Sequence, residues 1–336
     1  MASNRYRIDD KFYISDLHLK IFVIGYGRYG ESTVLLLSNG DVVNYSVVID
    51  SYQYKKDNKL PYINKAIDLL RKHHVKHLDL LCWTHPHDDH SKGLVSILNS
   101  FCDEDTDVLY PMYVENNASD IVQLNLVSKE TVNRILEINR DGLVTANPIG
   151  VKGGRYNNVD EFDIVNPYDE EEIRHVKVDV LTPISSKLTK YVNNAQCTDP
   201  NELSITMILD IDGYGFYFGG DTTNEHIDDS NKSKMGKCRF VKIPHHSSST
   251  ANHLLHYLPV DQLDAVCTTV FNWGKSKLPE PTVIKEYQKY FEDVYTTNKD
   301  LRREDYGIIE YEYDFNHGYP VCEVREHGNV GKMEMV

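Results

Sequence analysis

Cysteine is scarce and scattered in this sequence. Six cysteines are spread over 336 residues, and no two of them form a Cys-x-x-Cys pair. This spacing excludes a disulfide-stabilised scaffold and a zinc ribbon, and it favours a reducing compartment. The N-terminal stretch MASNRYRIDD also lacks the apolar core of a signal peptide. We therefore expect a cytoplasmic protein.

Long apolar runs and net positive charge are absent as well. No segment offers the ~20 consecutive apolar residues that a membrane span needs, so no membrane partner is expected. The chain has 36 basic and 51 acidic residues, which gives a net charge of −15. This balance argues against a protein that coats nucleic acid through bulk charge, but it leaves room for a local basic groove. Hydrophobic residues make up 40% of the chain, as in an ordinary globular protein.

Strand-like and helix-like segments alternate along the whole chain. The first fifty residues are typical of strands, while helical spacing of apolar residues appears at 61–74, 91–100, 119–139 and 283–291. Residues 78–83 form a short, continuously apolar run that suggests a buried strand. Because no linker rich in Pro, Gly or Ser divides the chain, we predict one α/β domain over residues 1–336 with two sheets.

An acidic insertion is expected at roughly 115–175 of this domain. Its stretch GVKGGRYNNVDEFDIVNPYDEEEI has the composition of a long surface loop. A lid over a site is the alternative interpretation.

The motif GYGRYG at 25–30 matches the dinucleotide-binding fingerprint GxGxxG, and Asp50 follows at the right distance. That fingerprint works only if its third glycine opens a helix that faces the pyrophosphate. The next residues, STVLLLSNG, are typical of a strand instead. We therefore predict a glycine-rich turn between two strands.

Histidine is concentrated in one part of the chain. Six of the fifteen histidines fall between residues 73 and 90, and three belong to the motif THPHDDH at 84–90, directly after the apolar run. A turn there can direct His85 and His87 toward one cation, while Asp89 and His90 reach a second. Imidazole nitrogen together with carboxylate oxygen suits zinc, manganese or iron. The motif thus predicts two divalent transition-metal ions, Zn²⁺ or Mn²⁺.

The chain resembles the metallo-β-lactamase superfamily and, within it, the branch that contains the DNA-uptake protein ComEC. The resemblance covers most of residues 20–300. It rests on THPHDDH followed by Gly93, similar to the family's HxHxDHxxG, on the strand YGFYFGGD, and on FVKIPHHSSS, similar to the branch's PHHGS motif. It implies a four-layer αββα sandwich of two mixed sheets. It also implies hydrolysis by a hydroxide held between two metal ions.

The same resemblance assigns roles to further residues. Asp221 stands where the family has its metal-bridging aspartate, although taken alone it could also cap a helix. Since neighbours in an extended chain point opposite ways, only one of His245 and His246 should bind metal. We favour His246 as the ligand and His245 as a substrate contact or proton donor, with the reverse left open. Asp50 is expected to orient the histidine turn, or else to be an ordinary turn residue.

The sequence departs from the family at one ligand. Many members carry another histidine shortly before the bridging aspartate, where this chain has Asp199 and Asn201. The His85/His87 site is then one ligand short, and Asn201, water or substrate would complete it. A weaker site of this kind favours manganese or an exchangeable metal.

Hydrolysis is the expected reaction, with Asp89, Asp88 and His245 as catalytic candidates. Asp88 or His245 could protonate the leaving group. The resemblance to the ComEC branch points to phosphodiester bonds, hence a nuclease or phosphodiesterase. Lys237 and Arg239 lie in a basic stretch at 232–242 and are candidate contacts to a nucleic acid, although such a stretch is often a solvated loop.

Two alternatives stay open. One is hydrolysis of a small ester, a phosphorylcholine-type ester or a lactone. The other is a non-catalytic module that binds metal for structure. The sequence names no protein partner.

Overall fold

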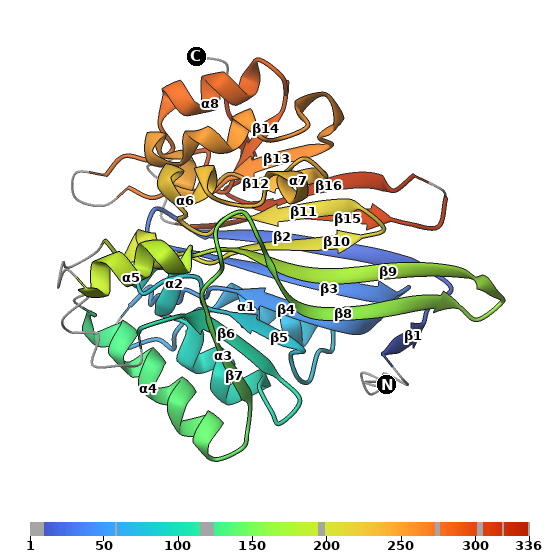
Figure 1. Ribbon diagram of the computed structural model, residues 1–336, viewed down its shortest axis with the longest axis horizontal. Coiled ribbons are helices and arrows are strands. Elements are labelled where there is room, and N and C mark those ends of the chain that lie inside the picture. The colour runs from blue at the N-terminus through green and yellow to red at the C-terminus, as the bar shows by residue number, and fades with distance from the viewer. Residues whose placement is uncertain are drawn as a thin grey trace.

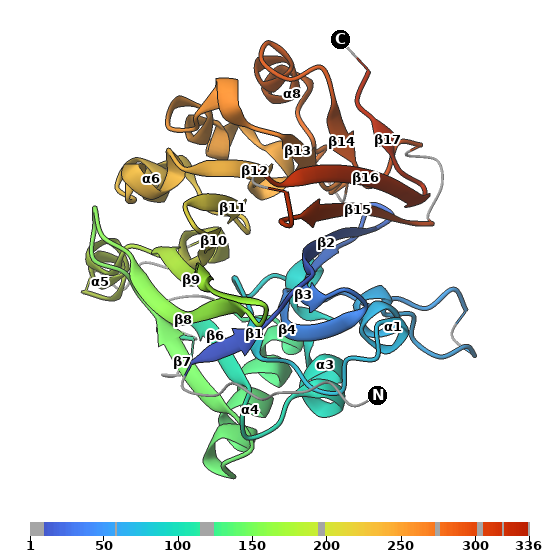
Figure 2. The same ribbon diagram turned by 90° about the vertical axis from the view of Figure 1, so that its right-hand side faces the viewer.

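The computed structural model describes residues 10–57, 59–114, 124–193, 199–272, 276–300, 305–317 and 319–334 (Figure 1). Two large sheets lie face to face in the middle of the molecule, and helices cover their outer faces (Figure 2). Within these residues, no helix combines the length and apolar character needed to cross a membrane.

The first sheet contains eight strands within the described ranges, in the order β16-β15-β2-β3-β4-β5-β6-β7. Their bounds are β2 Leu17–Tyr26, β3 Glu31–Asn39, β4 Val42–Ile49, β5 Leu80–Cys82, β6 Asp107–Pro111, β7 Thr145–Ile149, β15 Tyr306–Asp314 and β16 Val321–Gly328. Pairing is antiparallel from β16 to β4 and parallel from β4 to β7, so the sheet is mixed.

The second sheet contains nine strands within the same ranges, in the order β1-β8-β9-β10-β11-β12-β13-β14-β17. Their bounds are β1 Lys11–Tyr13, β8 Asn157–Asn166, β9 Asp169–Thr182, β10 Thr206–Ile211, β11 Tyr214–Phe218, β12 Cys238–Lys242, β13 Ala265–Thr268, β14 Val294–Thr296 and β17 Gly331–Lys332. The run from β11 to β14 is parallel, and the β8–β11 meander is antiparallel.

Helices occupy the two outer layers (Figure 2). The α-helices are α1 Lys65–Lys72, α2 Asp88–Ser91, α3 Leu94–Phe101, α4 Leu126–Arg140, α5 Ser185–Asn193, α6 Asn224–Asp228, α7 Lys232–Met235 and α8 Pro281–Gln288. The 3₁₀ segments are η2 Pro200–Leu203, η3 His245–Ser247, η4 Ser249–His256 and η5 Val260–Gln262. Helix α1 shows a sequence-encoded start, because the side chain of Asn64 accepts a hydrogen bond from the Ile67 main-chain nitrogen.

Strand alternation divides the core into three apolar layers. On β2, Ile21 and Val23 face the space between the sheets, while Phe22 and Ile24 face the layer under α1, α3 and α4. On β11, Phe218 faces the central layer and Tyr217 faces the layer under α8 and η4. Side chains two apart share a face of a strand, so each sheet buries both faces. The predicted αββα sandwich of two mixed sheets is thereby confirmed.

The surface loop predicted for GVKGGRYNNVDEFDIVNPYDEEEI, residues 150–173, is wrong over most of its length. Residues 157–166 and 169–182 form the paired strands β8 and β9 instead. Apolar residues such as Phe162, Ile164, Val176 and Val178 alternate along them and enter the central layer. The acidic run at 169–172 is exposed near the hairpin end, which explains its loop-like composition. Residues 115–123 lie outside the described residues.

Gly25 and Tyr26 of the GYGRYG segment end β2, and its residues 27–30 form the turn to β3, which pairs antiparallel with β2. No helix follows Gly30, because β3 begins at Glu31. The rejection of a dinucleotide fingerprint is therefore confirmed.

Candidate metal centre

The site is assembled where the carboxyl ends of four strands meet. In the first sheet, parallel strands β4 and β5 end just before Asp50 and Thr84. In the second, parallel strands β11 and β12 end before Asp221 and His245. Main-chain hydrogen bonds tie these ends together, since the Ile205 nitrogen donates to Thr84 O at 3.0 Å and the His245 nitrogen donates to Gly220 O at 2.9 Å.

The histidine motif is held rigidly after β5. His87 precedes α2, which carries Asp89 and His90. The Ser91 hydroxyl donates to the His87 carbonyl at 2.6 Å and accepts from the Trp83 indole at 3.0 Å. Gly93 is required because a Cβ there would lie 2.4 Å from Ser51 Oγ. The turn thus presents its side chains in one fixed arrangement.

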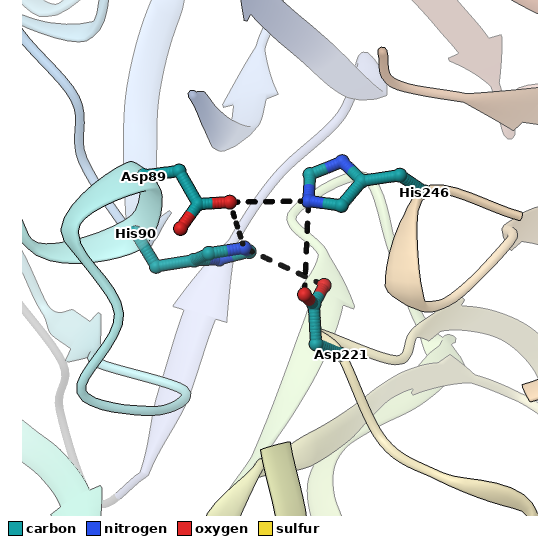
Figure 3. Close-up of side chains that lie close together, drawn as sticks. All are labelled: Asp89, His90, Asp221 and His246. Carbon is teal, nitrogen blue, oxygen red and sulfur yellow. Dashed lines mark hydrogen bonds and ion pairs between the residues drawn. The ribbon is translucent and has the colours of Figure 1, made fainter. Parts of the chain in front are cut away.

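Four buried side chains from both sheets converge on one point (Figure 3). His90 Nε2 lies 3.4 Å from Asp89 Oδ2 and 3.4 Å from Asp221 Oδ1. His246 Nε2 lies 3.3 Å from Asp89 Oδ2 and 3.7 Å from Asp221 Oδ2. Tetrahedral metal ligands at zinc-like bond lengths stand about 3.3–3.6 Å apart, so this spacing fits a single ion.

Two atoms of this cluster support a cation more directly. His90 Nε2 and Asp221 Oδ1 are buried, and neither has a hydrogen-bond partner among the described residues. Buried polar atoms are rarely left unpaired, because losing water without a replacement costs free energy. A metal ion at the centre of the cluster would satisfy both atoms.

Hydrogen bonds fix which nitrogen of each histidine faces the centre. Asp50 Oδ2 lies 2.7 Å from His90 Nδ1 and can only accept, so Nδ1 donates and Nε2 keeps its lone pair. Thr84 donates its hydroxyl hydrogen to Asp50 at 2.6 Å, so His85 Nδ1, at 3.0 Å, must donate to Thr84. Both imidazoles therefore present an unprotonated Nε2 when neutral, as metal ligands do.

A second ligand group lies on the other side of Asp221. It consists of His85, His87 and Asp221. His85 Nε2 is 3.1 Å from His87 Nδ1 and 3.7 Å from Asp221 Oδ2. The carboxylate of Asp221 thus belongs to both groups, so it could bridge two ions.

Asn201 lines the same pocket as His87 and Asp221 of this second group. Its Nδ2 is 3.3 Å from His245 Nε2, and its buried Oδ1 has no hydrogen-bond partner among the described residues. Asp199 accepts a hydrogen bond from the Asn201 main chain at 3.0 Å and so fixes the start of η2. Completion of the His85/His87 group by Asn201 stays a prediction.

His245 and His246 diverge because the chain turns sharply after Pro244. His245, His246 and Ser247 have φ values of 51°, 47° and 62°, in the left-handed region that non-glycine residues rarely adopt. As a result, His246 enters the four-residue cluster, whereas His245 faces Asn201, with its Nε2 3.9 Å from Asp221 Oδ2.

Charges within the cluster shift its pKa values. Burial lowers the pKa of His90, but surrounding carboxylates, Asp221 foremost, outweigh it and raise the pKa well above its usual value. The pKa of His246 is raised in the same way, chiefly by Asp221 and Glu31 against the effect of burial. Against its own burial, Asp221 has its pKa lowered well below normal by His246 and His90. The cluster therefore attracts positive charge strongly.

The other two histidines near Asp221 behave differently. Burial lowers the pKa of His85 well below its usual value. Burial also lowers the pKa of His245. Neutral imidazoles are the form that metal ions bind, so His85 needs no proton removed first.

A pocket of about 490 Å³ opens over both groups. Its described lining is His87, Asp88, Asp89, Asn125, Asp199, Asn201, Asp221, His245, His246, Phe271, Ser276 and Leu278. Phe271 covers the imidazole of His246, with ring centroids 5.3 Å apart. No lysine or arginine is among these described lining residues.

Most of the predicted site residues come together here. His85, His87, Asp89, His90, Asp221 and His246 form the two ligand groups, and Asp50, Asn201, His245 and Asp88 adjoin them. Asp88 lines the pocket and remains largely solvent-exposed, and partial loss of solvent around its carboxyl, together with the negative charge of Asp89, raises its pKa.

Lys237 and Arg239 are not brought to the pocket. They lie at the start of β12, whose far end leads to His245, and a strand advances ~3.3 Å per residue. The basic stretch is not one patch either, because Lys234 pairs with Asp179 at 2.5 Å and Lys242 is buried against Glu31. Sequence reasoning missed Glu31 and Thr269, since neither stands in a motif with ligand spacing.

Comparisons with known proteins add little. No known protein-family profile matches the sequence, and no curated protein matches it. The chain is similar to a crystal structure described as "Putative metal-dependent hydrolase from Parabacteroides distasonis ATCC 8503" at 2.30 Å resolution, with 14% identity and a TM-score of 0.34. The similarity covers 83% of this chain and 84% of that chain. A likeness of this extent does not identify a function.

Proposed function

We propose that this protein is a two-metal hydrolase that cleaves phosphodiester bonds in a small substrate. The observation that carries the proposal is the pair of ligand groups that share Asp221 beneath one pocket. Binuclear hydrolytic sites use two neighbouring ions to act on both the attacking and the leaving oxygen. The His85 and His90 side chains supply nitrogen ligands, one on each side of the shared carboxylate.

The chain itself provides orientation. When bound, two divalent ions would lower the pKa of water and offset charge on the reacting phosphoryl oxygen. Hydrogen bonds to Asp50 and Thr84 hold His90 and His85 in their ligand orientation before any ion arrives. Ligands that are already oriented lose little conformational freedom on binding.

His245 is the residue we assign to proton movement. It lines the pocket, its Nδ1 lies 2.8 Å from the Thr250 hydroxyl, and its Nε2 faces Asn201 and Asp221. A neutral imidazole in this position can take up or return a proton at Nε2 during turnover. Asp88, at the mouth of the same pocket, is the second candidate for this role.

The pocket favours a small phosphodiester over a long nucleic acid. Its volume of about 490 Å³ is that of a small-molecule site. A long polyanion usually needs several lysine or arginine contacts, and the described lining supplies none. Asn125, Asn201 and Ser276 offer neutral hydrogen-bonding groups instead.

A carboxylic ester or lactone is the second candidate substrate. Phe271 and Leu278 form an apolar wall on the pocket and could hold the apolar part of such a molecule. The same ligand groups would serve carbonyl hydrolysis, so only turnover separates the two classes.

The test combines metal analysis with a substrate panel. Native protein, Asp221→Ala and the surface control Asp169→Ala would be loaded with Mn²⁺ or Zn²⁺ and assayed on a dinucleotide, bis-p-nitrophenyl phosphate, single-stranded DNA, p-nitrophenyl acetate and a lactone. We expect native and control proteins to bind metal and cleave the small phosphodiesters, while Asp221→Ala loses both properties.

Other outcomes have plain meanings. Preferential cleavage of acetate or lactone would favour the second candidate, and preferential cleavage of single-stranded DNA would remove the restriction to small substrates. Full phosphodiesterase activity in Asp221→Ala would refute the metal mechanism. Metal binding without turnover of any substrate would leave a non-catalytic metal-binding module.

A further inference from the structure

We infer that Glu31, paired with Lys242, is a positioning residue for the ligand group formed by Asp89, His90, Asp221 and His246. The inference rests on the metal binding contained in the proposed function. Glu31 directly follows the GYGRYG segment, which resembles a dinucleotide fingerprint but forms the turn after β2. The inference gives this turn a role in placing Glu31.

Glu31 reaches His246 through a hydrogen-bonded chain. The Thr269 hydroxyl donates to Glu31 Oε2, and a carboxylate can only accept. His246 Nδ1 lies 2.9 Å from Thr269 Oγ1, so Nδ1 must be the donor there. This leaves His246 Nε2 with its lone pair directed into the cluster. Glu31 Oε2 also lies 3.3 Å from His246 Nδ1, so its negative charge stands close to this imidazole as well.

The same carboxylate adjoins the second imidazole of the group. Glu31 Oε1 lies 3.7 Å from His90 Nδ1, next to the closer contact of His90 with Asp50. Glu31 and Asp50 thus stand behind the two histidines on the side away from the pocket. Carboxylates in this position fix the tautomer and ring orientation of metal-binding histidines.

Lys242 balances the charge of Glu31 and shows that no third ion belongs there. Glu31, Asp50 and His90 are close enough together to be considered as a metal site themselves. However, Lys242 Nζ lies 2.6 Å from Glu31 Oε1, and both side chains are buried. The ammonium already occupies the place of a cation, so the carboxylate is a partner of the ligands and not a ligand.

The pair also joins the two sheets beneath the ligands. Glu31 begins β3 of the first sheet, and Lys242 ends β12 of the second, three residues before His245. Gly30 lets the turn before Glu31 lie directly against the histidine motif, because a Cβ there would lie 2.8 Å from the Asp89 carbonyl oxygen and 2.3 Å from the Tyr52 ring. The ion pair between Glu31 and Lys242 therefore fixes His246 of the second sheet relative to the first sheet.

The test measures metal binding by itself, without turnover. Isothermal titration with Co²⁺ or Mn²⁺, together with Co²⁺ absorption spectra, would be recorded for the full-length native protein, Thr269→Val and the double variant Glu31→Gln/Lys242→Met. Thr269→Val interrupts the hydrogen bonds from Glu31 to His246, while Glu31 remains paired with Lys242, so no unpaired buried charge is created. The double variant removes both charges, so neither partner is left unpaired.

A matched control is available on the second sheet. Asp179 on β9 is buried and pairs with Lys234 at 2.5 Å, away from the ligands. Asp179→Asn/Lys234→Met therefore removes a comparable ion pair. Melting temperatures of all variants would be measured without metal.

We expect one of the two binding steps to weaken by about 10- to 100-fold in Thr269→Val and in the double variant, with a changed Co²⁺ spectrum. The step due to His85 and His87 should stay native, as should both steps in the control. Native affinities in folded Thr269→Val and Glu31→Gln/Lys242→Met would overturn the inference and leave the proposed function standing. If the native protein bound no ion, both would fall.

Discussion

Asp221 Oδ1 lies 3.4 Å from His90 Nε2, and neither of these buried atoms has a hydrogen-bond partner among the described residues. The carboxylate comes from the second sheet and the imidazole from the helix that follows β5 of the first. The separation of these two atoms is typical of two ligands on one metal ion, and it is too long for a good hydrogen bond.

Replacing Asp221 by Asn should affect both ligand groups together. An amide keeps the shape of the side chain but loses the negative charge that two cations would share. We expect metal content to fall at both sites and turnover to drop by at least about 100-fold. Elemental analysis and steady-state kinetics measure the two effects. Loss of only one ion would show that the carboxylate does not bridge.

Asn201→His should strengthen the weaker ligand group. Asn201 lies 3.3 Å from His245 Nε2 and lines the same pocket as His87 and Asp221, so an imidazole at this position could add a nitrogen ligand to the His85/His87 group. We expect tenfold or greater tightening of one Zn²⁺ binding step, about 1.4 kcal/mol, whereas Asn201→Ala should weaken that step. Competition with a chromophoric chelator measures it. Equal affinity in all three proteins would remove Asn201 from the site.

Substitutions of His245 and His246 should have different effects, one on turnover and the other on metal binding. His245→Gln should lower kcat by about 10²–10⁴-fold while both ions remain bound, since the residue moves protons but is not needed as a ligand. His246→Gln should lose one ion. Metal content and kcat measured on the same preparations decide between these roles, and the reverse pattern would exchange the two assignments.

Metal binding should strengthen as the pH rises. The raised pKa values of His90 and His246 mean that protons occupy the cluster in the metal-free protein near neutrality. An incoming ion must displace them, so affinity should increase from about pH 6 to about pH 8 with release of protons. Titration calorimetry in two buffers of different ionisation enthalpy counts those protons. A metal affinity that is independent of pH would contradict the inference that His90 and His246 are protonated in the metal-free protein near neutral pH.

Above about pH 7, where the histidines with lowered pKa values are neutral in both folded and unfolded protein, stability without metal should change in the opposite direction. A histidine whose folded-state pKa is raised stabilises the protein fully below its unfolded pKa of about 6.5, and this contribution is lost as the pH rises through the folded pKa. The melting temperature of the chelated protein should therefore fall with rising pH. Adding metal at about 100 times its Kd should raise the free energy of unfolding by about 2.7 kcal/mol. Scanning calorimetry with and without chelator tests both statements.

The sequence predicted the general architecture well because its information is local. Alternating apolar residues in β2 and β3 and the buried run at β5 indicate strands whatever surrounds them. The loop predicted within 115–175 failed because exposed acidic residues dominate β8 and β9, while the side chains that enter the core are spread among them. The average composition of residues 150–173 concealed the alternation of buried and exposed residues that is typical of strands.

By itself, then, the sequence determined which candidate ligands lie close together in the chain. His85, His87, Asp89 and His90 fall within six residues, so one turn is enough to gather them. Only the tertiary structure decided how Asp221 is shared, which histidine of the 245–246 pair enters the cluster, and that Glu31 and Lys242 meet behind it. These contacts join strands of two different sheets, and no local periodicity records which strand ends will be neighbours.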